Sequence, residues 1–411
     1  THPIERGLAE NEDIYFQSVE ARNKNYDEMA NVVVYYMEQV NRITGSHVKP
    51  FNYYGDEEAE YIIIAMGSVV DTAKLVVESE NKKGKKYGVV EVHLYRPFSS
   101  QFLKEALPKS VKRIAVLDRT KEAGSTGEPL YLDCLAALND LEIPIIGGRY
   151  GLSSKNTTPS DLYSVFMNLE GEFKNHFTIG IEDDVTHLSL PKYTYDLPLD
   201  AKEIVVYGFG SDGMVSASKE LLHLASVKLN KFVDGYSLYD SKKSGGVTVN
   251  NLRIKEKEFY APFYVENPDL VVVTKDEYFK KYQMIDSIKE NGILLINTTD
   301  EEVLKKKICF EDKKIIKERN IKVMVVNASS LAVDCHIKGK INKIMEVIIL
   351  KLLGINDALE LVSETIENTF RDKGEEVIKN NKQAIEKAFD FLHPIAIELE
   401  GEKRDVPKTV F

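Results

Sequence analysis

Short apolar runs that alternate with helix-like stretches constrain the fold of this chain more than any other feature of its sequence. Four such runs follow one another between Glu58 and residue 146. A strand that is apolar throughout is buried on both faces, and helices between consecutive strands are typical of a parallel sheet. We therefore predict an α/β domain over residues 56–195, with helices on both faces of a parallel sheet. The expected strands are 61–65, 88–94, 111–117 and 143–146, and the expected helices are 67–82, 100–106, 129–139 and one that begins after Thr158.

The same alternation returns after a linker-like stretch at Pro191–Ala201 and predicts a second parallel-sheet α/β domain over residues 196–400. Its most regular amphipathic stretch is Lys340–Leu353. Apolar residues recur there at helical spacing, which predicts a helix that faces the core. The other expected helices are 213–229, 277–289, 358–370 and 375–392. The expected strands are 203–207, 232–239, 247–253, 269–273, 292–296 and 323–326.

The two ends of the chain lack this alternation. We interpret residues 1–55 as a connector that carries one amphipathic helix, Asp27–Thr44, and an extended arm around Asp13–Gln17. Residues 401–411 are polar and are expected to form a linker. Because the sequence starts at Thr1 without a basic-then-apolar signal pattern, we expect a fragment of a longer chain or a processed product.

Composition limits the classes of function. The chain has 411 residues and a net charge of −11, which argues against general binding to nucleic acids or anionic membranes. No apolar run approaches the length of a membrane span. The three cysteines, Cys134, Cys309 and Cys335, form no C-x-x-C pair, whereas a cubane iron–sulfur cluster needs four thiolates. We therefore expect free thiols in a reducing cytoplasm.

Gly208, Gly210 and Gly213 form a G-x-G-x-x-G pattern between an expected strand and an expected helix. In this context the pattern can offer the N-terminus of the helix to a phosphate group. Asp234 follows at about the spacing of the ribose-binding acid in nicotinamide-dependent enzymes. It lies, however, inside the expected strand 232–239 rather than at its carboxyl end. The other interpretation is a plain strand-to-helix turn in which glycine only supplies a positive φ.

A second glycine-containing loop, Tyr239–Gly246, combines two lysines and flanking serines on a tightly bending backbone. Lys242, Lys243 and Ser244 could together bind a phosphate or another polyanion. A solvated hairpin turn is the alternative. If both loops lie at the carboxyl ends of strands in one sheet, they could border a single anion site.

Familiar catalytic signatures are missing from the sequence. It contains no G-x-S-x-G, P-loop or H-E-x-x-H motif, and its eight histidines are scattered. Glu182, Asp183 and Asp184 could hold a metal ion, but a solvated acidic turn is the more common role of such a cluster. We therefore predict neither a catalytic residue nor a metal ligand in this chain.

Several longer motifs resemble the pyruvate:ferredoxin (flavodoxin) oxidoreductases. The stretches 207–213 and 239–248 are similar to the gamma-type domain of that family. Earlier motifs are similar to the second domain of the same enzymes, which itself resembles the C-terminal domain of transketolase. These motifs are Leu94–Phe98, Leu117–Glu122, Gly148–Gly151 and His176–Thr186. The opening residues resemble the segment that follows the pyrimidine-binding domain, so the resemblance covers essentially the whole chain.

The resemblance implies a fragment of a cytoplasmic, homodimeric enzyme that decarboxylates pyruvate oxidatively. The enzymes of this family use thiamine diphosphate with Mg²⁺ and iron–sulfur clusters, reduce ferredoxin or flavodoxin, and transfer the acetyl unit to coenzyme A. The thiamine and cluster sites lie in other domains, so the fragment alone is expected to be inactive. Residues 56–195 are expected to act as scaffold and dimer contact.

In this family the gamma-type domain is associated with the coenzyme A pocket. The candidates for contacting coenzyme A are therefore Gly208, Gly210, Ser211, Asp212, Gly213, Lys242, Lys243 and Ser244. Two other functions stay open. One is a free-standing NAD(P)-dependent dehydrogenase that uses the Gly208–Gly213 loop, and the other is a non-catalytic subunit that only assembles with thiamine- and cluster-bearing partners.

Overall fold

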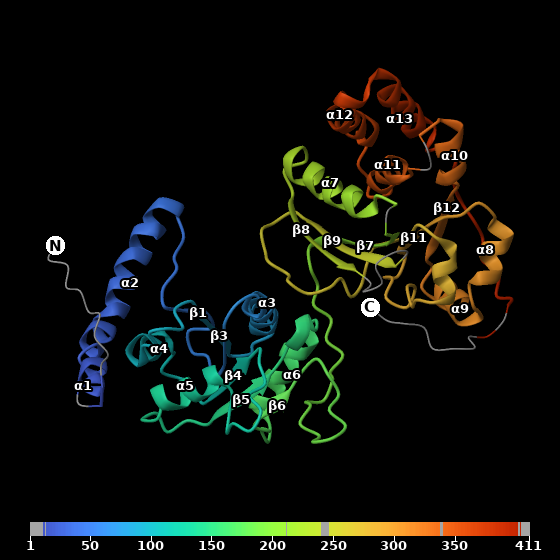
Figure 1. Cartoon of the computed structure of the whole chain (residues 1–411). Helices are drawn as coiled ribbons and strands as arrows, with labels where there is room; N and C mark the ends of the chain where they lie inside the picture. The colour runs from blue at the N-terminus through green and yellow to red at the C-terminus, as the bar shows by residue number, and fades with distance from the viewer. Residues whose placement is uncertain are drawn as a thin grey trace. The chain divides into compact units, whose positions relative to one another are not determined.

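The chain divides into two compact units, which are coloured in sequence order in Figure 1. One unit consists of Thr1–Pro198 with Tyr260–Phe263, and the other of Leu199–Phe259 with Tyr264–Phe411. The computed structural model describes residues 11–12, 14–210, 212–239, 246–337, 340–401 and 403. Each unit is built around one sheet, and the predicted α/β class is confirmed for both.

The sheet of the first unit has six strands in the order β1-β3-β2-β4-β5-β6. The four expected strands are parallel: β2 (Tyr61–Ala65), β3 (Tyr87–Val92), β4 (Arg113–Asp118) and β5 (Ile145–Arg149). Two short strands were not expected. β1 (Phe51–Gly55) comes from the stretch interpreted as a connector and pairs antiparallel with β3. β6 (Phe177–Thr178) extends the parallel part at the other edge.

Helices cover both faces of this sheet. On one face α3 (Val69–Asn81) and α6 (Pro159–Glu170) enclose a core in which the rings of Tyr87 and Phe166 stack 4.2 Å apart. On the other face lie α4 (Ser100–Ala106) and α5 (Pro129–Ala137). A short 3₁₀ turn, η1 (Leu152–Ser154), follows β5. The helices therefore agree closely with the predicted alternation.

The helical segment before the first sheet differs in part from the prediction. The prediction of an extended arm around Asp13–Gln17 is wrong for its second half, because helix α1 spans Tyr15–Glu20. α2 (Asn23–Thr44) includes the expected helix and ends at Gly45, whose φ of 73° is left-handed. Most of the apolar side chains on α2 are exposed, and Ala30 is buried.

The sheet of the second unit has seven strands in the order β13-β12-β11-β10-β7-β9-β8. Its centre is parallel and consists of β7 (Ala201–Phe209), β10 (Leu270–Val273), β11 (Ile293–Asn297) and β12 (Lys322–Val326). The prediction of an all-parallel sheet is wrong toward both edges, where antiparallel strands occur. β9 (Val247–Lys255) runs antiparallel to β7 and to β8 (Phe232–Tyr239), and β13 (Leu392–Pro394) runs antiparallel to β12.

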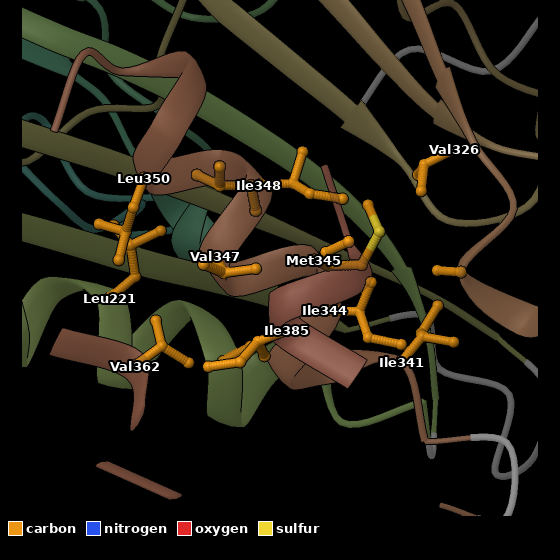
Figure 2. Packing of buried hydrophobic residues seen from close by; sticks show 14 of the residues in the cluster. Leu221, Val326, Ile341, Ile344, Met345, Val347, Ile348, Leu350, Val362 and Ile385 are labelled. Carbon is orange, nitrogen blue, oxygen red and sulfur yellow. The ribbon is translucent and has the colours of Figure 1, made fainter. Parts of the chain in front are cut away.

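One face of this sheet carries a helical layer, and its buried core is shown in Figure 2. The helices are α7 (Met214–Val227), α10 (Ala328–Asp334), α11 (Asn342–Leu352), α12 (Ala358–Phe370) and α13 (Glu375–Lys387), with the 3₁₀ turn η3 (Arg371–Lys373) between the last two. α11 is the amphipathic stretch predicted to face the core. Its residues from Ile344 to Leu350 are at most 1% exposed.

The opposite face is covered by α8 (Glu301–Lys307), α9 (Phe310–Glu318) and the segment between β10 and β11. The predicted helix 277–289 is wrong. That segment contains only a 3₁₀ turn, η2 (Asp276–Lys280), and then continues without regular structure. Within the described residues, no helix has both the length and the apolar character that crossing a bilayer requires.

Candidate functional site

The glycine loop is a tight turn between β7 and α7. Gly213 caps α7 with a φ of 84°, and a Cβ atom there would lie 3.3 Å from Cβ of Asn342. A Cβ atom at Gly208 would lie 2.9 Å from both Cβ of Met214 and Oγ1 of Thr248. Conformation and close packing therefore both favour glycine here, which a plain strand-to-helix turn would also require.

The carboxylate of Asp212 accepts the hydrogen bonds that hold this turn. The backbone N–H groups of Phe209 and Met214 donate to it at 2.6 and 2.9 Å. The hydroxyl of Thr274, just after β10, donates at 2.9 Å. A phosphate at the start of α7 would thus meet a negative charge that already accepts from the first backbone N–H of that helix, at Met214.

The second loop lies mostly outside the described residues, as do Ser211, Lys242, Lys243 and Ser244. Its described ends lie beside the glycine loop. Tyr239 pairs with Thr248, Phe209 pairs with Val247, and the N–H of Gly210 donates to the carbonyl of Gly246 at 3.0 Å. Because β7 and β8 both run antiparallel to β9, their carboxyl ends lie at the same edge of the sheet. Both loops therefore begin at the same edge of the sheet.

A pocket of about 530 Å³ opens at this edge. Its lining residues belong to the carboxyl ends of β7, β10 and β11 and to the helices after β12. They are Phe209, Asp212, Thr274, Lys275, Asp276, Glu277, Asn297, Thr298, Thr299, Ser329 and Ile341. Most of these were missed from the sequence. The available signal was a run of polar residues directly after each buried strand, which a parallel sheet brings to one edge.

Lys307 forms ion pairs with two acidic side chains of the pocket, Asp276 and Glu277. Lys307 Nζ lies 2.7 Å from Asp276 Oδ1 and 3.1 Å from Glu277 Oε1, and the hydroxyl of Thr298 donates to Asp276 at 3.0 Å. Burial alone would lower the pKa of Lys307, but its bonds to the two carboxylates raise it above the ordinary value. Two of the three carboxylates that line the pocket are therefore paired with a cation, and Lys275 adds a positive charge to the lining.

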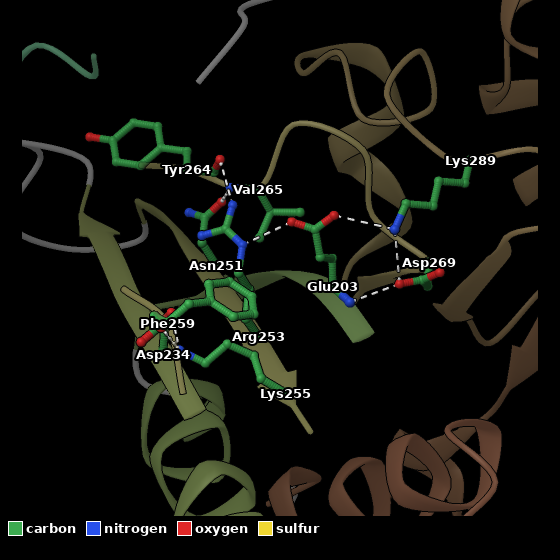
Figure 3. Close-up of polar contacts among 10 residues, drawn as sticks. All are labelled: Glu203, Asp234, Asn251, Arg253, Lys255, Phe259, Tyr264, Val265, Asp269 and Lys289. Carbon is green, nitrogen blue, oxygen red and sulfur yellow. Dashed lines mark hydrogen bonds and ion pairs between the residues drawn. The ribbon is translucent and has the colours of Figure 1, made fainter. Parts of the chain in front are cut away.

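Asp234 takes part in a buried polar network, which Figure 3 shows on one face of β9. Its carboxylate lies 2.7 Å from Nζ of Lys255, which also donates to the carbonyl of Phe259. Nearby, Arg253 pairs with Glu203 at 2.8 Å and donates to the carbonyl of Tyr264 at 3.0 Å. Asp234 thus forms an ion pair between β8 and β9, which agrees with the earlier argument against it as a ribose-binding acid.

The cysteines do not form a ligand set. Cys134 is buried in the core of the first unit, where burial raises the pKa of its thiol. In the second unit Cys335 belongs to the core under the helical layer, whereas Cys309 precedes α9 on the opposite face of the sheet. The three thiols therefore lie in three separate places, and this arrangement does not fit an iron–sulfur cluster.

The acidic turn at residues 182–184 is held by its own backbone. The Asp183 carboxylate accepts from the N–H groups of Val185, Thr186 and Leu188 and from the Thr186 hydroxyl. These bonds, with that hydroxyl first, hold its pKa below the usual range. In the part of the chain that the structure describes, no group of three His, Cys, Asp or Glu side chains could hold a metal ion.

Comparison with known proteins relates both units to one family. Residues 203–391 match the model for "Pyruvate ferredoxin/flavodoxin oxidoreductase", and residues 59–162 match "Pyruvate:ferredoxin oxidoreductase core domain II". A solved structure, the pyruvate oxidoreductase subunit PORC from Thermotoga maritima, is 29% identical and covers 47% of this chain and 98% of its own, with a TM-score of 0.39.

Two curated relatives match almost the whole chain. Pyruvate-flavodoxin oxidoreductase from Enterobacter agglomerans is 38% identical over 96% of this chain and 35% of its own length. Pyruvate:ferredoxin oxidoreductase from Moorella thermoacetica is 38% identical over 96% of this chain and 34% of its own length. The chain thus spans about a third of the length of these relatives. With both family models matched in succession, the chain belongs to the pyruvate:ferredoxin (flavodoxin) oxidoreductase family.

Proposed function

We propose that this chain is part of a cytoplasmic, homodimeric enzyme that oxidatively decarboxylates pyruvate to acetyl-CoA and reduces ferredoxin or flavodoxin. The observation that carries this proposal is the 38% identity to enzymes of that name over 96% of the chain. Within it, we assign residues 1–55 to a connector, 56–195 to a scaffold domain, 196–400 to a gamma-type domain and 401–411 to a linker.

The enzyme's thiamine diphosphate, Mg²⁺ and iron–sulfur clusters are proposed to bind outside these residues. The three dispersed cysteines supply no cluster ligands, and the described acidic residues form no metal site. This chain alone is therefore expected to be inactive. We propose that its own contribution comes from the carboxyl edge of the second sheet, where polar groups converge.

At this edge we propose part of the coenzyme A site. Gly208, Gly210 and Gly213 let the backbone turn closely, and Asp212 orders that turn. Ser211 and the Lys242-Lys243-Ser244 stretch supply hydroxyl and ammonium donors suited to phosphate. Support comes from the common sheet edge of the two loops and from the adjacent pocket.

The test uses the complete enzyme with Lys242→Ala and Lys243→Ala combined. The KM for coenzyme A should rise, since two ammonium groups near its phosphates are lost, whereas pyruvate decarboxylation without coenzyme A should change little. The combined Lys82→Ala and Lys83→Ala variant is the control, because it removes an exposed lysine pair from the first unit. An unchanged KM in the first variant would contradict the proposed coenzyme A site.

The NAD(P)-dependent dehydrogenase is the second candidate. Its two supports are the N-terminus of α7 as a phosphate site and Asp234 as a ribose-binding acid. Asp212 already accepts from the first N–H of α7, and Asp234 pairs with Lys255. Separate titrations of the complete enzyme with NAD(H) and coenzyme A decide between the two. Binding of coenzyme A alone is expected.

A further inference from the structure

Lys275 stands out among the charged residues of the pocket at the carboxyl edge of the second sheet. It follows β10 by two residues, and its Nζ lies 3.3 Å from the ring centroid of Phe209, at the end of β7. Among the described residues, no carboxylate forms an ion pair with it. Within the described part of the chain, the interaction found for its ammonium group is this ring face, so its N–H donors can serve an anion.

The carboxylates around Lys275 are already engaged. Asp212 accepts from two backbone N–H groups and from Thr274, and Asp276 accepts from Lys307 and Thr298. Glu277 pairs with Lys307, and its side chain is 64% exposed. The positive charge of Lys275 is therefore the one in this pocket that lacks a compensating carboxylate among the described residues.

Neutral donors complete this side of the pocket. Asn297 fixes the end of β11 against α10, because its Nδ2 donates to the carbonyl of Thr274 at 3.1 Å and its Oδ1 accepts from the N–H of Ala328 at 2.9 Å. The same Nδ2 lies 3.3 Å from Ser329 Oγ. Ser329 accepts there, and a hydroxyl that accepts can also donate; Thr299, which also lines the pocket, carries a second hydroxyl donor.

We propose that this pocket binds one of the phosphate groups of coenzyme A, with Lys275 as its cation and Thr299 and Ser329 as neutral donors. The inference rests on the proposed function and adds a second cationic position to it. β10 and β9 flank β7 on opposite sides, so Lys275, after β10, and the described ends of the second loop, Tyr239 and Gly246, lie on either side of the glycine loop. Coenzyme A carries phosphate at two separate places, a diphosphate and a ribose 3′-phosphate, which suits two cationic positions.

The experiment measures binding to the complete enzyme by isothermal titration with coenzyme A and with dephospho-coenzyme A. Lys275→Met keeps the aliphatic chain on the Phe209 ring and removes the charge, and it should weaken coenzyme A binding about tenfold or more. Lys275→Arg should retain most of the affinity. Lys322→Met is the matched control, since Lys322 is exposed at the amino end of β12, the opposite edge of the sheet.

Each outcome has a defined meaning. A loss seen with coenzyme A but not with dephospho-coenzyme A assigns the 3′-phosphate to Lys275, and an equal loss with both assigns the diphosphate. If Lys275→Met binds coenzyme A with unchanged affinity, only the role of Lys275 is overturned. If that variant melts early, Lys275→Gln is measured in its place and is judged in the same way. A complete enzyme that binds no coenzyme A before any substitution overturns the proposed function as well.

Discussion

At the scale of single residues, Asp212 holds the glycine loop in its turn. Replacing it with alanine would leave the N–H groups of Phe209 and Met214 and the hydroxyl of Thr274 without their acceptor. We expect Asp212→Ala to lower the free energy of unfolding of the second unit by about 1–3 kcal/mol. Chemical denaturation of the 411-residue chain, followed by circular dichroism, measures this loss.

The matched control for this prediction is Asp357→Ala. Asp357 also precedes a helix, α12, but its side chain makes no capping hydrogen bond there. Its removal should change stability by only a few tenths of a kcal/mol. Equal losses in the two variants would mean that the hydrogen bonds of Asp212 do not stabilise the loop.

At the level of single residues, the sequence predicted the glycine loop but not most of the residues that line the pocket. The spacing of Gly208, Gly210 and Gly213 marks a turn whose geometry needs glycine, and such local geometry is visible in a sequence. Lys275 belongs to a polar run after β10 and Ser329 to the start of α10, and neither fits a known motif spacing. Only the strand order brings them to one edge, and periodicity does not reveal strand order.

At the scale of elements, a buried ion cluster joins α7 to α11. Lys343, 1% exposed, lies between Glu220 Oε1 at 2.5 Å and Glu346 Oε2 at 3.1 Å. The other oxygen of Glu346 has no hydrogen-bond partner within the described structure. Burial, against the opposing effect of Lys343, raises the pKa of Glu346 to about 8.

This cluster predicts how stability depends on pH. The ordinary pKa of glutamate is 4.5, so between about pH 5 and 8 the folded chain binds more protons at Glu346 than the unfolded chain. Stability should therefore fall as pH rises through this range, by at most about 1.4 kcal/mol per pH unit, and level off above it. Glu346→Gln should flatten the decline in the melting temperature of the second unit.

Glu364→Gln provides the comparison for Glu346→Gln. Glu364 pairs with Lys228 at 2.7 Å, but its side chain is 48% exposed, so solvent screens this pair. The pH dependence of melting should survive this substitution. If it also survives Glu346→Gln, the decline comes from other groups.

Elements were predictable where periodicity and packing agree. The stripe on α11 is long and regular, and that helix faces the core as expected. The segment 277–289 has enough apolar residues for a helix, yet Phe279, Ile285 and Ile288 fill the core from an irregular path. α8 was missed because it is short and charged, with Leu304 buried. The antiparallel direction of β9 was missed, although apolar and polar residues alternate in each half of its sequence, as is common in antiparallel strands.

At the scale of the whole molecule, each unit has apolar cores on both faces of its own sheet. The first unit contains the cores around Phe166 and Leu130, and the second contains those around Ile348 and Phe279. Alternation of strands and helices was sufficient to predict two such domains. Each sheet is covered by elements of its own unit. Each unit therefore has its own hydrophobic core and is expected to unfold cooperatively by itself.

Two separate unfolding transitions are therefore expected for the 411-residue chain. Phe166 is fully buried in the first unit and Phe279 is 1% exposed in the second, so truncating either ring leaves a cavity that costs about 3–5 kcal/mol. Phe166→Ala should lower one calorimetric transition and leave the other in place, and Phe279→Ala should do the reverse. Each variant serves as the control for the other, because both lose the same side chain. A single transition that shifts alike in both variants would show that the two units unfold as one cooperative body.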